Sequence, residues 1–276
     1  MKFPRRDFLK TSLAASATAA LASRVQAAPA AASLAGREYY ELRAYRQKAG
    51  ARAGLDTYLE KAFLPALDKR GIKNVGVFTE LDVNKNAGTS TPKADTPVWV
   101  LIPYASLDAF VGVSAEINAE AGVQKAGGEY LQAKKATPAF DRIDSWLLLA
   151  FKSMPKMSLP SFSKSRTPTR VFEMRDYESH SELKALSKMA MFDEGETEIM
   201  KDLGMNPVFF GQALAGPNLP HLRYITSGPD LATHLANWKK FGPDARWVKM
   251  KDLPQYAENT SKNTARFLAP TAYSQI

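Results

Sequence analysis

The sequence predicts an α+β fold in which two tandem ferredoxin-like (split βαβ) units pack sheet to sheet and form one barrel within the chain. Three observations predict this fold. A short motif recurs in the two halves, the same series of strands and helices follows each copy, and a segment rich in proline and serine separates the copies.

The first residues have the order of an export signal. Arg5 and Arg6 stand in a short basic stretch, and an apolar, alanine-rich run over about residues 11–22 follows. That run has no polar face and is shorter than the roughly 20 residues of a membrane span. The sequence therefore predicts a signal peptide, and no membrane span in the mature chain.

The paired arginines indicate the twin-arginine route of export. Pro4 stands where such signals usually carry Ser or Thr, so the Sec route stays open. Small residues before the cut predict cleavage after Ala27, with Ala28 and Ala30 as alternatives. We expect residues 1–27 to be the signal peptide and the mature protein to be periplasmic or secreted.

The composition is that of an ordinary globular protein and excludes several classes of function. The net charge is +9, but residues 1–27 hold five basic and one acidic side chain, which leaves about +5 in the mature chain. No basic cluster accompanies a nucleic-acid-binding motif, so we expect no nucleic-acid partner. The chain has no cysteine, which excludes disulfides, thiolate metal sites and a cysteine nucleophile.

The repeated motif is aromatic-Glu-aliphatic-Arg-x-Tyr, and each copy predicts a strand. It occupies residues 40–45 and again residues 172–177. Two copies of one unit, over residues 37–151 and 169–276, are the simplest interpretation. Residues 152–168 between them carry prolines and serines without a helical or strand period, and are expected to be the linker.

A helix is expected after each motif strand. In the first copy apolar residues recur at spacings of three and four, and Gly71 ends the helix. In the second copy Ser179 and Glu182 resemble a capping box, Gly195 weakens the middle, and Gly204 ends the helix.

Two further strands and the start of a second helix then follow in each copy. They are residues 75–81, 98–104 and 106–109 in the first copy, and residues 208–214, 222–226 and 228–232 in the second. With a last strand, this order is that of a four-stranded antiparallel sheet with both helices on one face. The bare face of each sheet needs a cover, so the two sheets are expected to pack on each other.

Alternation along the motif strand gives it a polar face and an apolar face. The polar faces of the two copies carry Glu41, Arg43, Tyr45, Glu173, Arg175 and Tyr177. We expect the apolar faces to meet the helices, which would place the polar faces between the two sheets. An unpaired charge there would cost several kcal/mol, so these groups must pair or meet a ligand.

Two interpretations of this polar set stay open. In the first, Glu–Arg salt bridges and Tyr hydroxyls form a closed network that fixes strand register and the docking of the halves. In the second, part of the lining faces a cavity and binds a small anionic or polar ligand through Arg43 or Arg175. A carboxyl whose pKa is raised by burial could also do acid–base work.

The second half resembles a known family. The residues that carry the resemblance are Trp238, Phe241, Asp244 and Trp247, in the spacing Trp-x-x-Phe-x-x-Asp-x-x-Trp. This segment resembles the signature of the NIPSNAP family, and residues 268–274 resemble a family terminus. The resemblance extends well over residues 169–276 and loosely over 37–151. It implies the dimeric α+β barrel superfamily, in agreement with the order of elements.

The first copy departs from the family pattern, because it lacks the tryptophan signature and carries an insertion over about residues 115–135. A site built on the signature would therefore occur once. Trp238, Phe241 and Trp247 either pack together at the end of the sheet or form the aromatic wall of a ligand pocket. Asp244 is expected to cap a short helix that carries Trp247.

The histidines and the catalytic motifs searched for in the sequence do not indicate a reaction. His180, His221 and His234 are the only histidines, and none has the spacing of a metal ligand set. No phosphate-binding loop, nucleophile elbow or dinucleotide fingerprint occurs. We therefore predict no metal and no cofactor, and the catalytic residues, if there are any, stay unknown.

These observations favour an exported protein without an assignable reaction that binds a small molecule or a protein partner. The expected place of binding is the barrel interior or the groove between the repeats. The alternative is a cofactor-poor small-substrate enzyme of oxygenase or isomerase type, which the superfamily resemblance implies. A third hypothesis is a scaffold that acts through an exposed apolar face or through self-association as a homo-oligomer.

Overall fold

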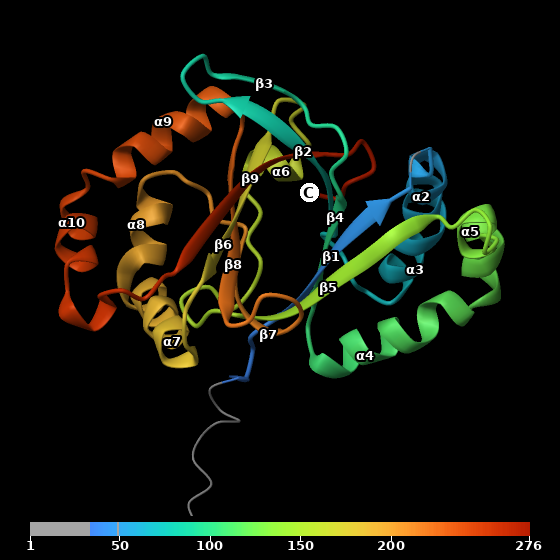
Figure 1. The fold of residues 1–276 in the computed structure, drawn as a ribbon, viewed down its shortest axis with the longest axis horizontal. Coiled ribbons are helices and arrows are strands. Elements are labelled where there is room, and N and C mark those ends of the chain that lie inside the picture. Colours follow the sequence, from blue (N-terminus) through green and yellow to red (C-terminus); the bar gives the residue numbers. More distant parts are fainter. Residues whose placement is uncertain (1–33, 49) are drawn as a thin grey trace, which may run out of the picture. The chain divides into compact units, whose positions relative to one another are not determined.

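The computed structural model describes residues 34–48 and 50–276, so the predicted signal peptide, residues 1–27, lies outside the described residues. Residues 36–276 form one compact unit, in which the strands lie between two groups of helices (Figure 1). The strands are β1 (Tyr39–Gln47), β2 (Gly76–Asn84), β3 (Thr89–Pro92), β4 (Val98–Tyr104), β5 (Phe140–Ala150), β6 (Val171–Glu178), β7 (Phe209–Ala215), β8 (His221–Gly228) and β9 (Lys262–Pro270).

Each half has one group of helices after its first strand, β1 or β6, and another after β4 or β8. The first half has α2 (Arg52–Tyr58), η1 (Leu59–Phe63), α3 (Leu64–Lys69), α4 (Leu107–Glu116), η2 (Ile117–Ala119) and α5 (Ala121–Leu131). The second half has α6 (Ser161–Lys164), α7 (Glu182–Met191), η3 (Phe192–Glu196), α8 (Thr197–Asp202), α9 (Leu231–Phe241), α10 (Ala245–Lys251) and η4 (Pro254–Tyr256). The short helix α6, which precedes β6, has no counterpart among the described helices of the first half.

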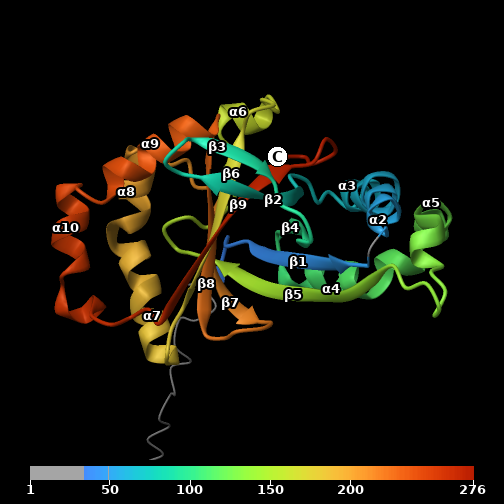
Figure 2. The same cartoon turned by 45° about the horizontal axis from the view of Figure 1, so that its top comes forward.

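The strands form one antiparallel sheet that closes on itself. Its order is β3-β2-β4-β1-β5-β7-β8-β6-β9, and an additional β2–β9 pairing completes a barrel. Each half contributes four strands in the ferredoxin-like order, and β3 extends the sheet from β2. The fourth strand of each half pairs with the second strand of the other, so the two seams are equivalent. The α+β barrel predicted from the repeat is confirmed, with a group of helices on two opposite sides (Figure 2).

The ends of the first helix of each half show how local sequence sets its limits. Gly71 and Gly204 follow the helices with φ of 75° and 72°, a conformation that glycine adopts without strain. The expected capping box was placed two residues early. Ser181, which directly precedes α7, accepts the Lys184 N–H at its hydroxyl, while Ser179 donates to the carbonyl of Asn259.

Both of these helices also contain one π-helical turn. The turns are η1 in the first half and η3 in the second. The helix runs through η1 without a break, whereas Gly195 in η3 has non-helical backbone angles and marks a kink. A π turn is often found at functional sites, but here it occurs in both copies. It is therefore a property of the repeated unit.

Three apolar layers hold the fold together. The barrel interior is filled by side chains from both halves, including Tyr40, Leu42, Trp99, Leu148, Phe172, Met174, Phe209, Ile225 and Leu268. A second layer lies between the first-half strands and their helices, and a third between the second-half strands and theirs. Burial of these layers supplies the main driving force for folding, since the chain contains no disulfide.

The predicted orientation of the motif strands is wrong. Tyr40 and Leu42 point into the barrel, while Tyr45 packs in the helix layer, and Phe172 and Tyr177 are arranged in the same way. A closed barrel interior is surrounded by strands on every side, so it takes the apolar face. The helix layer can take the polar face because helix side chains and its edges supply partners for charges.

A buried polar and aromatic cluster inside the barrel joins the two halves instead. The Arg223 guanidinium lies 4.1 Å from the Trp146 ring centroid and pairs with Asp176. Arg266 contacts Asp176 at 2.7 Å and lies 3.8 Å from Glu80 of the first half. The contacts of this cluster that join the two halves are those of Arg223 with Trp146 and of Arg266 with Glu80, a role that the first interpretation had given to the motif residues.

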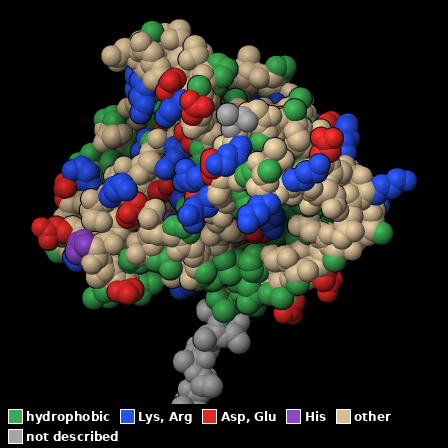
Figure 3. Space-filling view, turned by 45° about the vertical axis from the view of Figure 1, so that its right-hand side comes forward, with side chains coloured by type: hydrophobic (Ala, Val, Ile, Leu, Met, Phe, Trp, Pro, Cys, Tyr) green, Lys and Arg blue, Asp and Glu red, His purple; other side chains and the backbone are tan. Residues whose placement is uncertain are grey.

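The segment expected to be a structureless linker is partly ordered. It contains the short helix α6, and Met157 and Leu159 pack against the barrel interior cluster. The boundary between the repeats, residues 152–168, stays a prediction. On the surface, Lys and Arg side chains gather across the middle of the face in Figure 3, as the basic composition implies. Of the described helices, none has the length and hydropathy to cross a membrane.

Candidate functional site

The candidate site lies in the second half, where β6 faces α9. Glu173 on β6 is fully buried, and its carboxylate lies 2.8 Å from Nε2 of His234 on α9. Arg175 donates to the same carboxylate from Nε at 2.9 Å and approaches it from Nη2 at 2.8 Å. Arg175, on the same face of β6, and His234, on α9, thus both contact the buried carboxylate of Glu173.

Arg175 is held on three sides. Its guanidinium lies over the ring of Trp238 at 3.7 Å from the centroid, and Nη1 donates to the hydroxyl of Tyr177 at 3.4 Å. Burial acts to lower the pKa of Arg175, but Tyr224 and Glu173 raise the pKa above its ordinary value. The guanidinium is therefore a fixed positive charge beside an aromatic wall.

Glu173 remains ionised in this environment. Burial acts to raise the pKa of Glu173, but the hydrogen bond from His234 and the charge of Arg175 hold that pKa below its ordinary value of 4.5. Nε2 of His234 consequently carries a proton that faces Glu173. The indole nitrogen of Trp238 lies 3.1 Å from the same Nε2, which cannot donate to Glu173 and accept from Trp238 together. Nδ1 of His234 is buried and has no partner among the described residues.

The polar network continues from Arg175 toward the middle of the helix layer. The hydroxyl of Tyr177 lies 2.8 Å from that of Tyr224. Farther along, Lys188 on α7 and Glu196 on η3 form a buried ion pair at 2.9 Å. Burial raises the pKa of Glu196 above its ordinary value in spite of Lys188. The Lys188 ammonium lies 4.8–5.5 Å from the centroids of three aromatic rings.

A small pocket opens beside Glu173 and Arg175. Its volume is about 190 Å³, and it is lined by Lys85, Glu173, Arg175, Leu235, Trp238, Lys239 and Phe267. The lining combines three cationic side chains and one carboxylate with two aromatic rings and a leucine. Sites for drug-sized ligands measure roughly 300–1,000 Å³, so this pocket suits a smaller molecule.

In the first half the glutamate of the same motif has different hydrogen-bond partners. Glu41 accepts two hydrogen bonds from Arg43, at 2.6 and 2.9 Å, and one each from the hydroxyls of Tyr104 and Ser145, at 3.0 and 2.9 Å. Arg43 donates to Tyr45 at 3.2 Å. Four donors satisfy this carboxylate without a histidine, so Glu41, Arg43 and Tyr45 form the closed network of the first interpretation.

The three aromatic candidates of the tryptophan segment lie together, and only one of them reaches the pocket. Phe241 lies 5.8 Å from Trp238 and 4.6 Å from Trp247, measured between ring centroids. Trp247 sits on α10, where Asp244 accepts the Arg246 N–H as the predicted cap. Phe241 and Trp247 therefore pack against each other, and Trp238 alone lines the pocket.

Sequence reasoning missed His234, Lys188 and Lys85 as members of these networks. His234 stands four residues before Trp238, a spacing that places both on one face of the predicted helix, so this contact was available from the sequence. Lys188 lies in the middle of an apolar stripe and breaks it, which is a weaker signal. Lys85 reaches the pocket from the end of β2 in the other half, and nothing in the sequence indicates that meeting.

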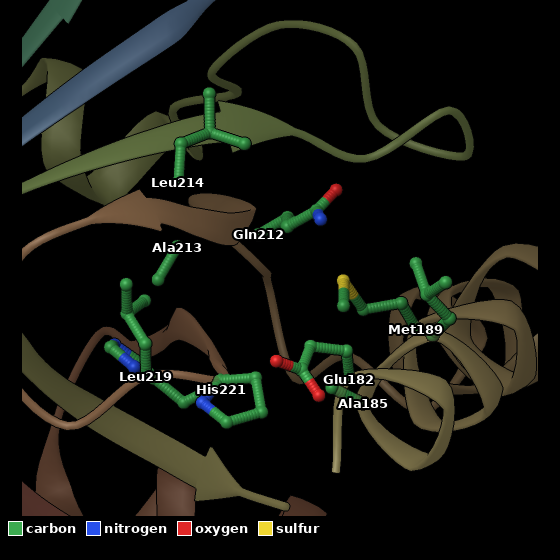
Figure 4. Close-up of a pocket in the computed structure, with 10 residues that line it drawn as sticks. Glu182, Ala185, Met189, Gln212, Ala213, Leu214, Leu219 and His221 are labelled. Carbon is green, nitrogen blue, oxygen red and sulfur yellow. The ribbon is translucent and has the colours of Figure 1, made fainter. Parts of the chain in front are cut away.

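A larger hollow of about 320 Å³ lies between α7 and the β7–β8 turn. Figure 4 shows Glu182 and Met189 projecting into it from α7, opposite Ala213 on β7. Its rim includes Leu186 and Leu219, which are about half exposed, and it contains none of the predicted site residues. In the part of the chain that is described, no three His, Asp or Glu side chains gather as metal ligands.

Two family models match the chain. Residues 172–275 match NIPSNAP, so the second half is a NIPSNAP domain, as the tryptophan segment predicted. Residues 2–22 match the twin-arginine translocation pathway signal sequence, and the chain is accordingly an exported protein. None of the curated proteins compared with the chain matches it.

Solved structures with the same fold include a candidate monooxygenase from Fusobacterium nucleatum. The two chains are 9% identical and superpose with a TM-score of 0.54 over 85% of this chain and 92% of the other. A NIPSNAP family protein from Agrobacterium tumefaciens is 18% identical with a TM-score of 0.34, and the match covers 38% of this chain and 96% of the other. A NIPSNAP-like domain protein from Burkholderia xenovorans is 14% identical with a TM-score of 0.35, over 39% and 90%. At such identities the first likeness shows the fold alone.

Proposed function

We propose that this exported protein binds a small molecule in the pocket beside Glu173 and Arg175 of its NIPSNAP domain. In this proposal the first half completes the barrel and has no ligand site of its own. The observation that carries the proposal is the buried Glu173–His234–Arg175 set next to an open pocket. A satisfied salt-bridge network such as that of Glu41 and Arg43, whose guanidinium also lies over an aromatic ring, would not need the pocket.

The interior of the barrel is a weaker candidate for binding. Seventeen buried residues from both halves form one cluster there, and two stacked tryptophans, Trp99 and Trp146, take part in it. A ligand would have to displace close-packed side chains. The helix side of β6 requires no such displacement, which supports binding there.

An acid–base enzyme is the second candidate, because Glu173 and His234 form a buried carboxylate–imidazole pair. A carboxylate is an effective general base when its pKa is raised toward neutral pH. The pKa of Glu173 is held below 4.5, which makes this carboxylate a weak base. Binding is therefore favoured over proton abstraction.

Native mass spectrometry of the mature protein purified from the periplasm tests the proposal. We expect a small molecule to co-purify with the wild-type chain. The double variant Arg175→Met, Glu173→Gln should lose it, because the stacked cation and its counter-charge are both removed.

The matched control is Arg43→Met, Glu41→Gln, which alters the same motif in the first half. That variant should retain the molecule. Equal retention by both variants, at stabilities that urea unfolding shows to be similar, would refute the proposed site.

A further inference from the structure

We infer that the ligand of this pocket is a small carboxylic acid with a compact apolar body. This inference rests on the proposed function and adds the chemical class of the ligand. The carboxylate is assigned to the Lys85 and Lys239 side of the pocket, and the apolar body to the wall formed by Leu235, Trp238 and Phe267.

The charges of the pocket point to an anion. Glu173 is already engaged by Arg175 and His234, and Arg175 in turn is engaged by Glu173, Tyr177 and Trp238. The charges left over are the ammonium groups of Lys85 and Lys239. Both side chains are exposed, and among the described residues neither forms a salt bridge. Two exposed cations in the lining, without a salt bridge among the described residues, attract an anionic group and disfavour a cation.

The walls point to an apolar body. Trp238 and Phe267 face the pocket together with Leu235, so much of the lining can contact only hydrocarbon or an aromatic ring. The Lys85 ammonium lies over the Phe267 ring at 5.4 Å from its centroid, which places positive charge against this apolar wall. A hydrated inorganic anion would use the cations and leave the wall unused. A carboxylic acid with an apolar body uses both.

The volume of the pocket limits the size of the apolar part of the ligand. A volume of about 190 Å³ holds a ring or a short chain with its carboxylate, and excludes nucleotides and long-chain lipids. Since the hydroxyls of Tyr104 and Ser145 complete the counterpart carboxylate in the first half, we expect one ligand per chain.

Isothermal titration calorimetry on the mature protein tests the class of ligand. The probes are acetate, hexanoate and benzoate, each with its uncharged amide, and sulfate, all at one fixed ionic strength. We expect hexanoate or benzoate to bind at one site and at least about tenfold more tightly than its amide, because the amide loses the charge-assisted contacts. Sulfate and acetate should bind more weakly than the larger acids.

Variants locate the site. Lys85→Gln with Lys239→Gln should weaken binding of the acid by about tenfold or more and leave the amide unaffected. The control, Lys152→Gln with Lys249→Gln, changes net charge equally at exposed positions outside the pocket and should leave both affinities unchanged.

The outcomes separate the two proposals. An amide that binds as tightly as its acid, or sulfate that binds as tightly as benzoate, would overturn the assignment of a carboxylic acid and leave the pocket as the site. Absence of binding by every acid would also overturn it. If in addition no molecule co-purifies, the proposed function falls as well.

Discussion

The two halves of this barrel share one strand motif and differ in what surrounds it. In the first half Glu41 is satisfied by Arg43 and by the hydroxyls of Tyr104 and Ser145. In the second half Glu173 meets Arg175 and His234, and a pocket adjoins them. Since both halves complete the same four-stranded sheet, the fold does not require the second arrangement. The difference is where a function specific to the NIPSNAP domain is to be sought.

The helix that follows the motif shows the same contrast. Counted back from the terminal glycines, Phe63 and Leu55 lie eight and sixteen residues before Gly71. Glu196 and Lys188 lie eight and sixteen before Gly204. The first half thus packs two apolar side chains where the second half buries an ion pair.

The largest effect is expected from breaking this ion pair. Lys188→Met leaves the buried carboxylate of Glu196 without its partner and should lower the free energy of unfolding by about 3–5 kcal/mol. Urea unfolding measures this change.

The double variant Lys188→Met, Glu196→Leu copies the apolar character of the first half. It should recover most of the lost stability, because well-packed apolar residues often replace a buried ion pair at little cost. If the double variant is as unstable as the single one, the ion pair is required for folding and the comparison of the halves fails at this position.

Substitution of the two motif glutamates sharpens the comparison at the strand. Glu173→Gln leaves Arg175 and His234 without a buried counter-charge, and should cost about 1.5–3 kcal/mol. Glu41→Gln keeps hydrogen bonds to two neutral hydroxyls and should cost less. Chemical denaturation of the two variants compares them directly, and equal losses would show that the two closures are energetically equivalent.

Ionisation of Glu173 should contribute to the pH dependence of the free energy of unfolding. Its pKa in the folded state lies below the ordinary value of 4.5, so the unfolded state binds more protons between the two values. The stabilisation is fully present above about pH 4.5 and is lost as the pH falls through the folded pKa. Urea unfolding from pH 7 to pH 3 should show a shallower acid decline for Glu173→Gln than for wild type. Identical declines would mean that Glu173 does not hold its charge preferentially in the fold.

The smallest effect is expected inside the π turns. The position of Ala62 in the first half is occupied by Gly195 in the second, nine residues before the terminal glycine in each case. A Cβ on Gly195 would approach the terminal methyl of Met250 to 2.5 Å, and that flexible side chain can move away. Gly195→Ala should therefore change stability by less than about 1 kcal/mol, as thermal unfolding can measure. A larger loss would show that Met250 is fixed in this contact.

Much of the fold could be predicted because patterns over a few neighbouring residues indicate the elements of each repeat. The motif strands, the helix ends at Gly71 and Gly204, and the cap at Asp244 follow from alternation, periodicity and turn chemistry over a few residues. The candidate site could be predicted only in part. Glu173, Arg175, Tyr177 and Trp238 were found from the motif and the tryptophan segment, but their partners come from distant elements.

The sequence by itself determined that this chain is exported, that it contains one unit twice, and which side chains share a face of each strand. Only the tertiary structure decided which face turns inward. Alternation shows which side chains share a face of a strand, but not which face lies inside the barrel. Closure of the barrel placed the apolar face of each motif strand in the interior. The same closure brought Lys85 of the first half to the pocket of the second, a contact that no local pattern encodes.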